Sequence, residues 1–297
     1  MLFPSRRLFL STAAAGWAAA VAGARAATLA PLSRFPVGVC DWMILKRQKP
    51  GAFKLTRDIG ADGVEVDMGG LGDRPTFDSR LSDPMVRDQF LAEAEKFGLR
   101  ICSIAMSGFY AQSFAERPGI ERVVQDAIDT TVAIGVQTIF LPLGVRSDLA
   151  AHPDLRPAVV ARLRAAGLRA ADAGVTIAIE TALDAAGEAA LLDEIGSSAI
   201  RSYFNFANAL QNGRDLHAEL RTLGRDRIRQ IHASNKDGVW LENDPEIDLP
   251  AVKQTLDDMG WEGWLVIERS RDAADARNVA RNFGANARAL KRVFQSN

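Results

Sequence analysis

The feature that most constrains how this chain folds is a regular alternation of short β-branched runs with longer amphipathic stretches. This alternation is typical of parallel strands joined by crossover helices, because parallel neighbours cannot be joined by a tight turn. Eight such units can be counted. The strands they predict are Val37–Cys40, Gly63–Asp67, Arg100–Ile104, Thr138–Leu143, Val175–Glu180, Ser202–Asn205, Ile228–His232 and Trp264–Glu268.

Between the predicted strands, the sequence carries signals for where helices start and stop. Proline suits a first helical turn and glycine a helix end. Start signals are Asp83-Pro84, Arg156-Pro157 and Leu249-Pro250, and end signals are Gly98, Gly135, Gly174 and Gly260. A doubly wound open sheet shares this alternation, but it usually needs fewer strands, and no glycine-rich phosphate loop follows the first one. The pattern therefore predicts an α/β fold, a single (β/α)8 TIM barrel.

The first 26 residues have the form of a twin-arginine signal peptide. Ser5-Arg6-Arg7-Leu8-Phe9-Leu10 precedes an alanine-rich apolar stretch, and Ala24-Arg25-Ala26 has the small-x-small form of a signal peptidase site. The alternatives are a retained membrane anchor and an ordinary helix, but the apolar stretch is shorter than the roughly 20 residues of a spanning helix. We expect a signal peptide over 1–26, a barrel over 27–297, passage through the twin-arginine export machinery and a periplasmic location.

Charge and cysteine content narrow the function classes further. Removing residues 1–26 takes away three arginines and no acids, so the net charge of -1 becomes about -4. Nothing basic remains to suggest binding to nucleic acid. Cys40 and Cys102 fall in predicted strands that are not neighbours, and they are predicted to be buried free thiols rather than a disulfide.

Three ionisable residues stand at the ends of predicted strands. Glu180, His232 and Glu268 each follow an apolar run, and in a barrel the carboxyl ends of the strands meet at one face. Buried carboxylates are costly unless they meet a cation or hydrogen-bond donors. Two carboxylates and an imidazole suit Mn²⁺, Mg²⁺ or Co²⁺ better than a thiolate zinc site would. The alternative is an internal salt-bridge network without metal.

The chain resembles the xylose isomerase-like superfamily of TIM barrels, which includes sugar isomerases and ketose 3-epimerases of the tagatose epimerase type. The resemblance covers nearly all of residues 27–297 and is more specific for fold than for substrate. It rests on Gly38-Val39-Cys40-Asp41-Trp42, Gly63-Val64-Glu65-Val66, Ile179-Glu180-Thr181, Ile231-His232-Ala233-Ser234-Asn235-Lys236-Asp237-Gly238, Ile247-Asp248-Leu249-Pro250 and Gly263-Trp264-Leu265-Val266-Ile267-Glu268.

The resemblance implies a divalent metal site with one ligand from each of four successive strands, here Glu180, Asn205, His232 and Glu268. The second position departs from the family pattern, which has an aspartate where this chain has Asn205. An amide oxygen can bind a hard cation, but one negative charge is lost, so metal affinity should fall.

The implied chemistry is proton transfer on a non-phosphorylated sugar. Glu180 and Glu268, on opposite faces of the sugar, would move protons through an enediolate in an epimerisation or isomerisation. The 3-epimerases place another glutamate where this chain has Ala186, with Asp184 and Glu188 the nearest acids. Strict 3-epimerase activity is therefore not carried over. A metal-dependent lyase or dehydratase on oxidised sugars and a non-catalytic carbohydrate-binding barrel are the alternatives.

Several other residues are weighed as contacts of a small-molecule carbohydrate. Trp42, Asn208 and Lys236 are predicted to bind substrate, although packing or a solvated loop would also explain them. Phe109 could stack on a sugar or pack in the core. Glu65 and Asp67 share a strand face that should turn toward the barrel interior. The chain has three histidines, which are too few for the trinuclear zinc site of endonuclease IV, and His152 and His217 are expected at the surface. Related barrels often dimerise, which makes a homodimer an expectation by analogy.

Overall fold

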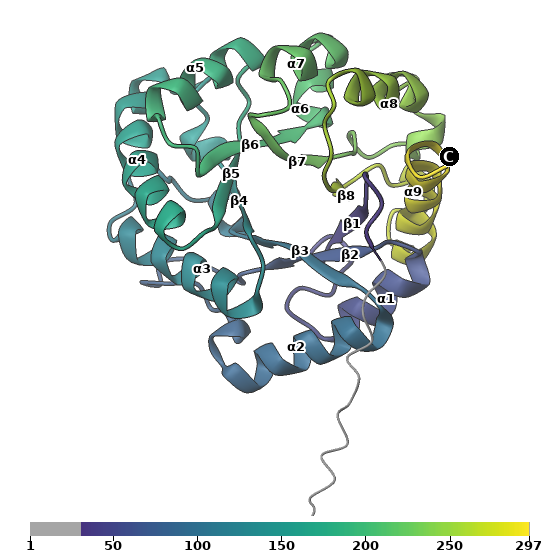
Figure 1. Cartoon of the computed structure of the whole chain (residues 1–297), viewed down its shortest axis with the longest axis horizontal. Coiled ribbons are helices and arrows are strands. Elements are labelled where there is room, and N and C mark those ends of the chain that lie inside the picture. The colour runs from purple at the N-terminus through teal and green to yellow at the C-terminus, as the bar shows by residue number, and fades with distance from the viewer. Residues whose placement is uncertain (1–30, 297) are drawn as a thin grey trace, which may run out of the picture.

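The computed structural model describes residues 31–296. In this part of the chain, eight parallel strands form a closed barrel in sequence order, from β1 to β8. Figure 1 shows the strands at the centre of a ring of helices. The predicted α/β fold class, a single (β/α)8 TIM barrel, is therefore confirmed.

The strands lie within two residues of their predicted bounds. Parallel strands buried on both faces read as continuous apolar runs, so their position in the sequence is well marked. The observed strands are β1 Val37–Cys40, β2 Gly63–Asp67, β3 Arg100–Ala105, β4 Thr138–Pro142, β5 Thr176–Glu180, β6 Ile200–Asn205, β7 Ile228–His232 and β8 Leu265–Ile267.

The helices start and stop where the sequence signals indicate. In α2, Pro84 occupies the first turn, the Asp83 side chain accepts from the backbone N–H of Met85, and Gly98 ends the helix with φ 65°. The α-helices are α1 Gly51–Ile59, α2 Pro84–Phe97, α3 Ile120–Ile134, α4 Arg156–Asp172, α5 Ala185–Ile195, α6 Phe206–Gln211, α7 Leu216–Leu223, α8 Leu249–Asp258 and α9 Val279–Phe294. The 3₁₀ turns are η1 Arg80–Ser82, η2 Ser107–Tyr110, η3 Val145–Ser147, η4 Pro153–Leu155, η5 Leu241–Asn243 and η6 Ala273–Asp275.

The large apolar core lies between the strands and the surrounding helices. Phe53 on α1, Leu163 on α4 and Leu256 on α8 are fully buried there. Each such side chain contributes about 1.5–3 kcal/mol by leaving water. The barrel closes where β1 pairs with β8, and α9 packs beside α1 across that seam (Figure 1).

The interior of the barrel is different, because it holds polar groups beside two small apolar clusters. One cluster contains Phe140 and Tyr203, and the other contains Cys40, Cys102 and Val266. The two cysteines are buried free thiols, as predicted. Their strands are not paired, yet both side chains reach the same interior cluster.

Within residues 31–296, no helix is long and apolar enough to cross a membrane. The predicted signal peptide lies outside the described residues, so the boundary at residue 26 stays a prediction.

Candidate active site

Four residues that end neighbouring strands meet at the carboxyl-terminal face of the barrel. Glu180, Asn205 and His232 are the last residues of β5, β6 and β7, and Glu268 follows β8 directly. Their exposed fractions are 7%, 5%, 0% and 5%, so all four are buried. The structure thus brings together the four residues that the sequence proposes as metal ligands, at the face where TIM barrels carry their active sites.

The Glu180 and Glu268 carboxylates are joined through the same two side chains. Asn205 Nδ2 donates to Oε2 of both glutamates, at 2.9 and 3.2 Å. On the other side, the Tyr110 hydroxyl lies 2.9 Å from Glu268 Oε1 and 3.4 Å from Glu180 Oε1. His232 Nδ1 lies 2.9 Å from Glu180 Oε2 and 3.9 Å from Glu268 Oε2. The two carboxylates therefore share the same three neighbouring side chains, those of Asn205, Tyr110 and His232.

Burial and this crowding shift the proton affinities of the site. Burial alone lowers the pKa of His232, but the Glu268, Glu180 and Glu65 carboxylates outweigh it and raise the pKa to about 10. For Glu268, burial raises the pKa, and the neighbouring Glu180 adds to that rise while His232 opposes it. Imidazolium is therefore the form that balances the carboxylates when no other cation is bound.

Asn205 is also the N-cap of α6, which begins at the next residue. Its Oδ1 accepts from the backbone N–H of Ala207 at 2.9 Å. Capping by asparagine is common because the side-chain oxygen satisfies an orphan N–H of the first turn. Because the cap uses the amide oxygen, the amide nitrogen faces the glutamates. This nitrogen donates hydrogen bonds and presents no ligand atom to a cation.

Tyr110 is a site residue that the sequence did not single out. It ends η2, directly after β3, and its ring packs against Phe140 at 6.0 Å. A side chain at Gly144 would clash, because a Cβ there would lie 2.5 Å from Tyr110 Cα. Of the two roles that the sequence allows for Phe109, the structure shows the second, because its ring packs against Phe77 and Phe114 in the core.

The three predicted substrate-binding residues lie in different settings. Trp42 is half-buried and stacks on Phe140 at 6.4 Å, in the same cluster as Tyr110. Asn208 on α6 donates to the backbone oxygen of Thr181 at 3.0 Å. Lys236 is exposed, with Nζ 3.3 Å from Glu246 Oε2. Of these, Trp42 packs with Phe140 in the cluster that also holds Tyr110, the tyrosine bonded to both glutamates.

Neither acid near Ala186 replaces the missing glutamate in this arrangement. Asp184 caps α5 by accepting from the backbone N–H of Gly187. Glu188 is buried and accepts from Thr181 Oγ1 at 2.7 Å, and burial raises its pKa to about 7. His152 is exposed and His217 is half-buried against Thr255, so both lie outside the site.

The interior-facing pair on β2 is buried as expected. Glu65 and Asp67 are both fully buried. Glu65 reaches across the barrel to His232, where its Oε1 lies 3.1 Å from Nε2. Asp67 accepts from the backbone N–H of Gly69 and faces Arg47 at 3.5 Å. Glu65 therefore contacts the site from the barrel interior, whereas Asp67, the last residue of β2, is bonded to the loop that follows the strand.

The structure offers three residues suited to hold a divalent cation. One ligand atom from each of Glu180, His232 and Glu268 lies within 4.8 Å of the others, and all three residues are buried. Two carboxylates and an imidazole are ligands that Mn²⁺ and similar ions accept. Asn205 does not fit as a fourth ligand in its present orientation, because its oxygen caps α6.

Comparison with known proteins gives the chain a family and several structural neighbours. A 2-epi-5-epi-valiolone 7-phosphate 2-epimerase from Actinoplanes sp. is 29% identical over 196 residues, which is 65% of this chain and 70% of the relative. The D-psicose 3-epimerase of Clostridium cellulolyticum H10 superposes with a TM-score of 0.69 at 13% identity, covering 87% of this chain and 99% of that one. The 3-keto-D-glucoside 4-epimerase of E. coli gives 0.66 at 17% identity, covering 86% and 99%.

These structural likenesses show the shared fold. A family model described as a xylose isomerase-like TIM barrel matches residues 53–293, which includes all four strand-end residues of the site. The chain therefore belongs to the xylose isomerase-like TIM barrel family.

Proposed function

We propose that this protein is a sugar isomerase or epimerase in which Glu180 and Glu268 transfer protons on opposite faces of a bound sugar, through an enediolate. The observation that carries the proposal is the pair of buried carboxylates joined through Tyr110 and Asn205 at the mouth of the barrel. The names of the similar proteins support the reaction class, because three of them are epimerases of sugars or sugar-like compounds.

Each residue of the pair has a role that its surroundings favour. Burial raises the pKa of Glu268, which favours a carboxyl group that both takes and returns a proton. Glu180 would remove the proton from carbon while Glu268 returns one to the other face, and the reverse reaction exchanges these roles. Tyr110 and Asn205 hold the two carboxylates at fixed separation, which is the positioning that such a transfer requires.

We also propose that Glu180, His232 and Glu268 hold a divalent cation, Mn²⁺, Mg²⁺ or Co²⁺. When bound, the cation would polarise a ketose carbonyl and its neighbouring hydroxyl and so acidify the carbon between them. Trp42 offers its face to the sugar ring, a contact of the kind that aromatic side chains make with apolar faces of ligands.

The substrate class is proposed as free sugars rather than sugar phosphates. This rests on the export signal predicted in residues 1–26, because phosphorylated metabolites are mostly cytoplasmic. Fusing residues 1–26 to a folded reporter tests the predicted export signal directly. We expect periplasmic reporter in the wild type and none with Arg6→Lys and Arg7→Lys together. Periplasmic reporter in the double variant would contradict twin-arginine export.

The reaction is tested by incubating the Mn²⁺-loaded protein in D2O with D-psicose, D-tagatose, L-ribulose and a 3-keto-D-glucoside, with matched phosphorylated ketoses as a second arm. We expect deuterium at the epimerised carbon of a free sugar, with the mass otherwise retained. Loss of water from the product would indicate the lyase instead. Sugar binding without any exchange would indicate a binding protein.

The two-glutamate mechanism makes a mutational prediction. Glu180→Gln and Glu268→Gln keep the shape of the side chain but cannot carry the proton, so each should lower kcat by about 10²- to 10⁴-fold. Steady-state kinetics on the substrate found above would measure this. Glu242→Gln, at an exposed residue paired with Arg292, is the control and should be unchanged. Wild-type rates in either site variant would overturn the mechanism.

A further inference from the structure

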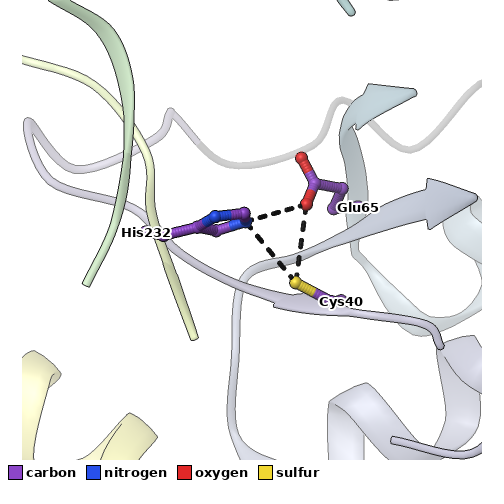
Figure 2. Close-up of side chains that lie close together, drawn as sticks. All are labelled: Cys40, Glu65 and His232. Carbon is purple, nitrogen blue, oxygen red and sulfur yellow. Dashed lines mark hydrogen bonds and ion pairs between the residues drawn. The ribbon is translucent and has the colours of Figure 1, made fainter. Parts of the chain in front are cut away.

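Beneath the candidate active site, His232 meets a second carboxylate. Figure 2 shows the Glu65 carboxylate and the Cys40 thiol facing the same ring nitrogen of His232. The distance from Nε2 is 3.1 Å to Glu65 Oε1 and 3.7 Å to Cys40 Sγ, and Cys40 Sγ lies 3.4 Å from Glu65 Oε1. All three residues are fully buried. The ring therefore has one nitrogen in the site and one in the barrel interior.

Glu65 is surrounded by hydrogen-bond partners on both of its oxygens. Oε1 faces Cys40 and His232, while Oε2 accepts from Ser103 Oγ at 2.5 Å and from Tyr203 OH at 2.8 Å. An ionised carboxylate accepts only and has about four lone-pair sites. Four neighbours therefore fill it, and each of them must supply a hydrogen.

Gln230 extends this hydrogen-bond network beyond the hydroxyls of Ser103 and Tyr203. Its Nε2 lies 3.0 Å from both Ser103 Oγ and Tyr203 OH. Because those two hydroxyls must give their single hydrogens to Glu65, they can only accept from Gln230. The amide must then turn its nitrogen toward them, and it has the two hydrogens needed. The network consequently runs in one direction, from Gln230 through the hydroxyls to Glu65.

We infer that Glu65 is a positioning residue, which keeps a hydrogen on Nε2 of His232 and so leaves Nδ1 as the nitrogen that serves the active site. The inference deepens the proposed function and rests on His232 as a ligand there. A carboxylate behind a metal-binding histidine fixes both the tautomer and the ring orientation. Here the carboxylate is itself held by Ser103 and Tyr203.

The competing interpretation makes Cys40, Glu65 and His232 a second metal site. The three side chains do offer ligand atoms close together. However, Glu65 has no lone-pair site left, and burial raises the pKa of the Cys40 thiol, so the thiolate that metals bind is disfavoured. The positioning role therefore predicts one bound ion per chain, and the second site predicts two.

The test compares wild type with Glu65→Gln, using nitrogen NMR of the Zn²⁺-loaded chain and Mn²⁺ titration. Since Ser103 and Tyr203 still need an acceptor, the new amide should turn its oxygen to them and its NH2 to His232. Nε2 must then accept, so the hydrogen moves to Nδ1 and Mn²⁺ affinity falls by about 10- to 100-fold. His152→Gln and His217→Gln assign the ring signals, because the chain has three histidines.

Cys40→Ala is the matched control, because it removes another partner of Glu65 Oε1 and leaves the carboxylate. It should keep the Nε2–H tautomer, the Mn²⁺ affinity and one ion per chain. Equal loss of affinity in both variants, an unchanged tautomer in Glu65→Gln, or two ions per wild-type chain would each overturn the inference.

If Glu65→Gln does not fold, the wild-type spectrum still decides, since a hydrogen on Nδ1 of the loaded chain contradicts the positioning role. No readout uses a sugar. Failure to turn over any sugar would therefore count against the proposed function alone, and a wrong tautomer in an active epimerase would count against this inference alone.

Discussion

At the scale of single residues, the most consequential feature is the orientation of the Asn205 amide. Its oxygen satisfies the backbone N–H of Ala207, and its nitrogen meets both glutamates. An aspartate at this position could cap the helix with one oxygen and present the other to a cation. The asparagine instead links the two carboxylates with a neutral donor, which stabilises them without adding charge.

Asn205→Asp should therefore raise Mn²⁺ affinity by at least about tenfold, because ligand charge sets the affinity of oxygen-rich sites. In chelator the same variant should have a lower Tm, since three carboxylates would then share the His232 imidazolium without a metal ion. Isothermal titration and thermal unfolding measure the two effects. Asn212→Asp, exposed at the end of the same helix, is the control. Unchanged affinity in Asn205→Asp would show that the helix cap does not decide ligation.

Tyr110 joins the same two carboxylates from the other side. Tyr110→Phe keeps the ring that packs on Phe140 and removes only the hydroxyl. A hydrogen bond to a charged group contributes about 1.5–3 kcal/mol, so kcat should fall by about 10- to 100-fold. KM should change less, because the hydroxyl orients the carboxylates rather than the sugar. Kinetics that show only a raised KM would instead make Tyr110 a substrate contact.

At the scale of elements, the placement of Tyr110 depends on two segments that follow different strands. η2 comes after β3, and Gly144 comes after β4. The backbone of η2 approaches Gly144 so closely that an added Cβ would lie 2.5 Å from Tyr110 Cα and 2.7 Å from its carbonyl oxygen. The absence of a side chain at residue 144 is therefore what admits the turn.

Gly144→Ala should displace η2 and reduce kcat at least as much as Tyr110→Phe does. It should also cost about 1–3 kcal/mol of stability, the usual penalty for overpacking. Urea unfolding and kinetics on the same samples measure both. Gly51→Ala, where the added Cβ meets nothing within 4 Å, is the matched control. A stable and fully active Gly144→Ala would show that the turn can shift without consequence.

Strand ends were predictable because parallel strands are continuous apolar runs, and their carboxyl ends converge on one face. This brought Glu180, His232 and Glu268 together from sequence alone. Tyr110 was missed because its position depends on how closely a turn approaches Gly144, which no local pattern encodes. The cap at Asn205 could have been found, since asparagine directly before a helix is a known start signal.

At the scale of the whole molecule, the barrel encloses acidic groups as well as apolar ones. Burial raises the pKa of Asp67 to about 6 and that of Glu188 to about 7, and burial also raises the pKa of Asp41. For each acid the folded-state pKa lies above the unfolded one. The folded chain therefore binds more protons between the two values, and its free energy of unfolding falls as pH rises through that window.

Glu188 permits a test, because it is buried on α5, is not one of the paired glutamates, and has one oxygen without a hydrogen-bond partner. Its window runs from 4.5 to about 7. Glu188→Gln stays neutral at both pH values. Its free energy of unfolding should therefore rise relative to that of wild type by on the order of 2–3 kcal/mol between pH 5 and pH 8. Urea unfolding at the two pH values measures this, with the exposed Glu194→Gln on the same helix as control. Parallel pH dependence of Glu188→Gln and wild type would mean that Glu188 is ionised in the folded chain at pH 5, and that its burial is compensated by partners beyond Thr181.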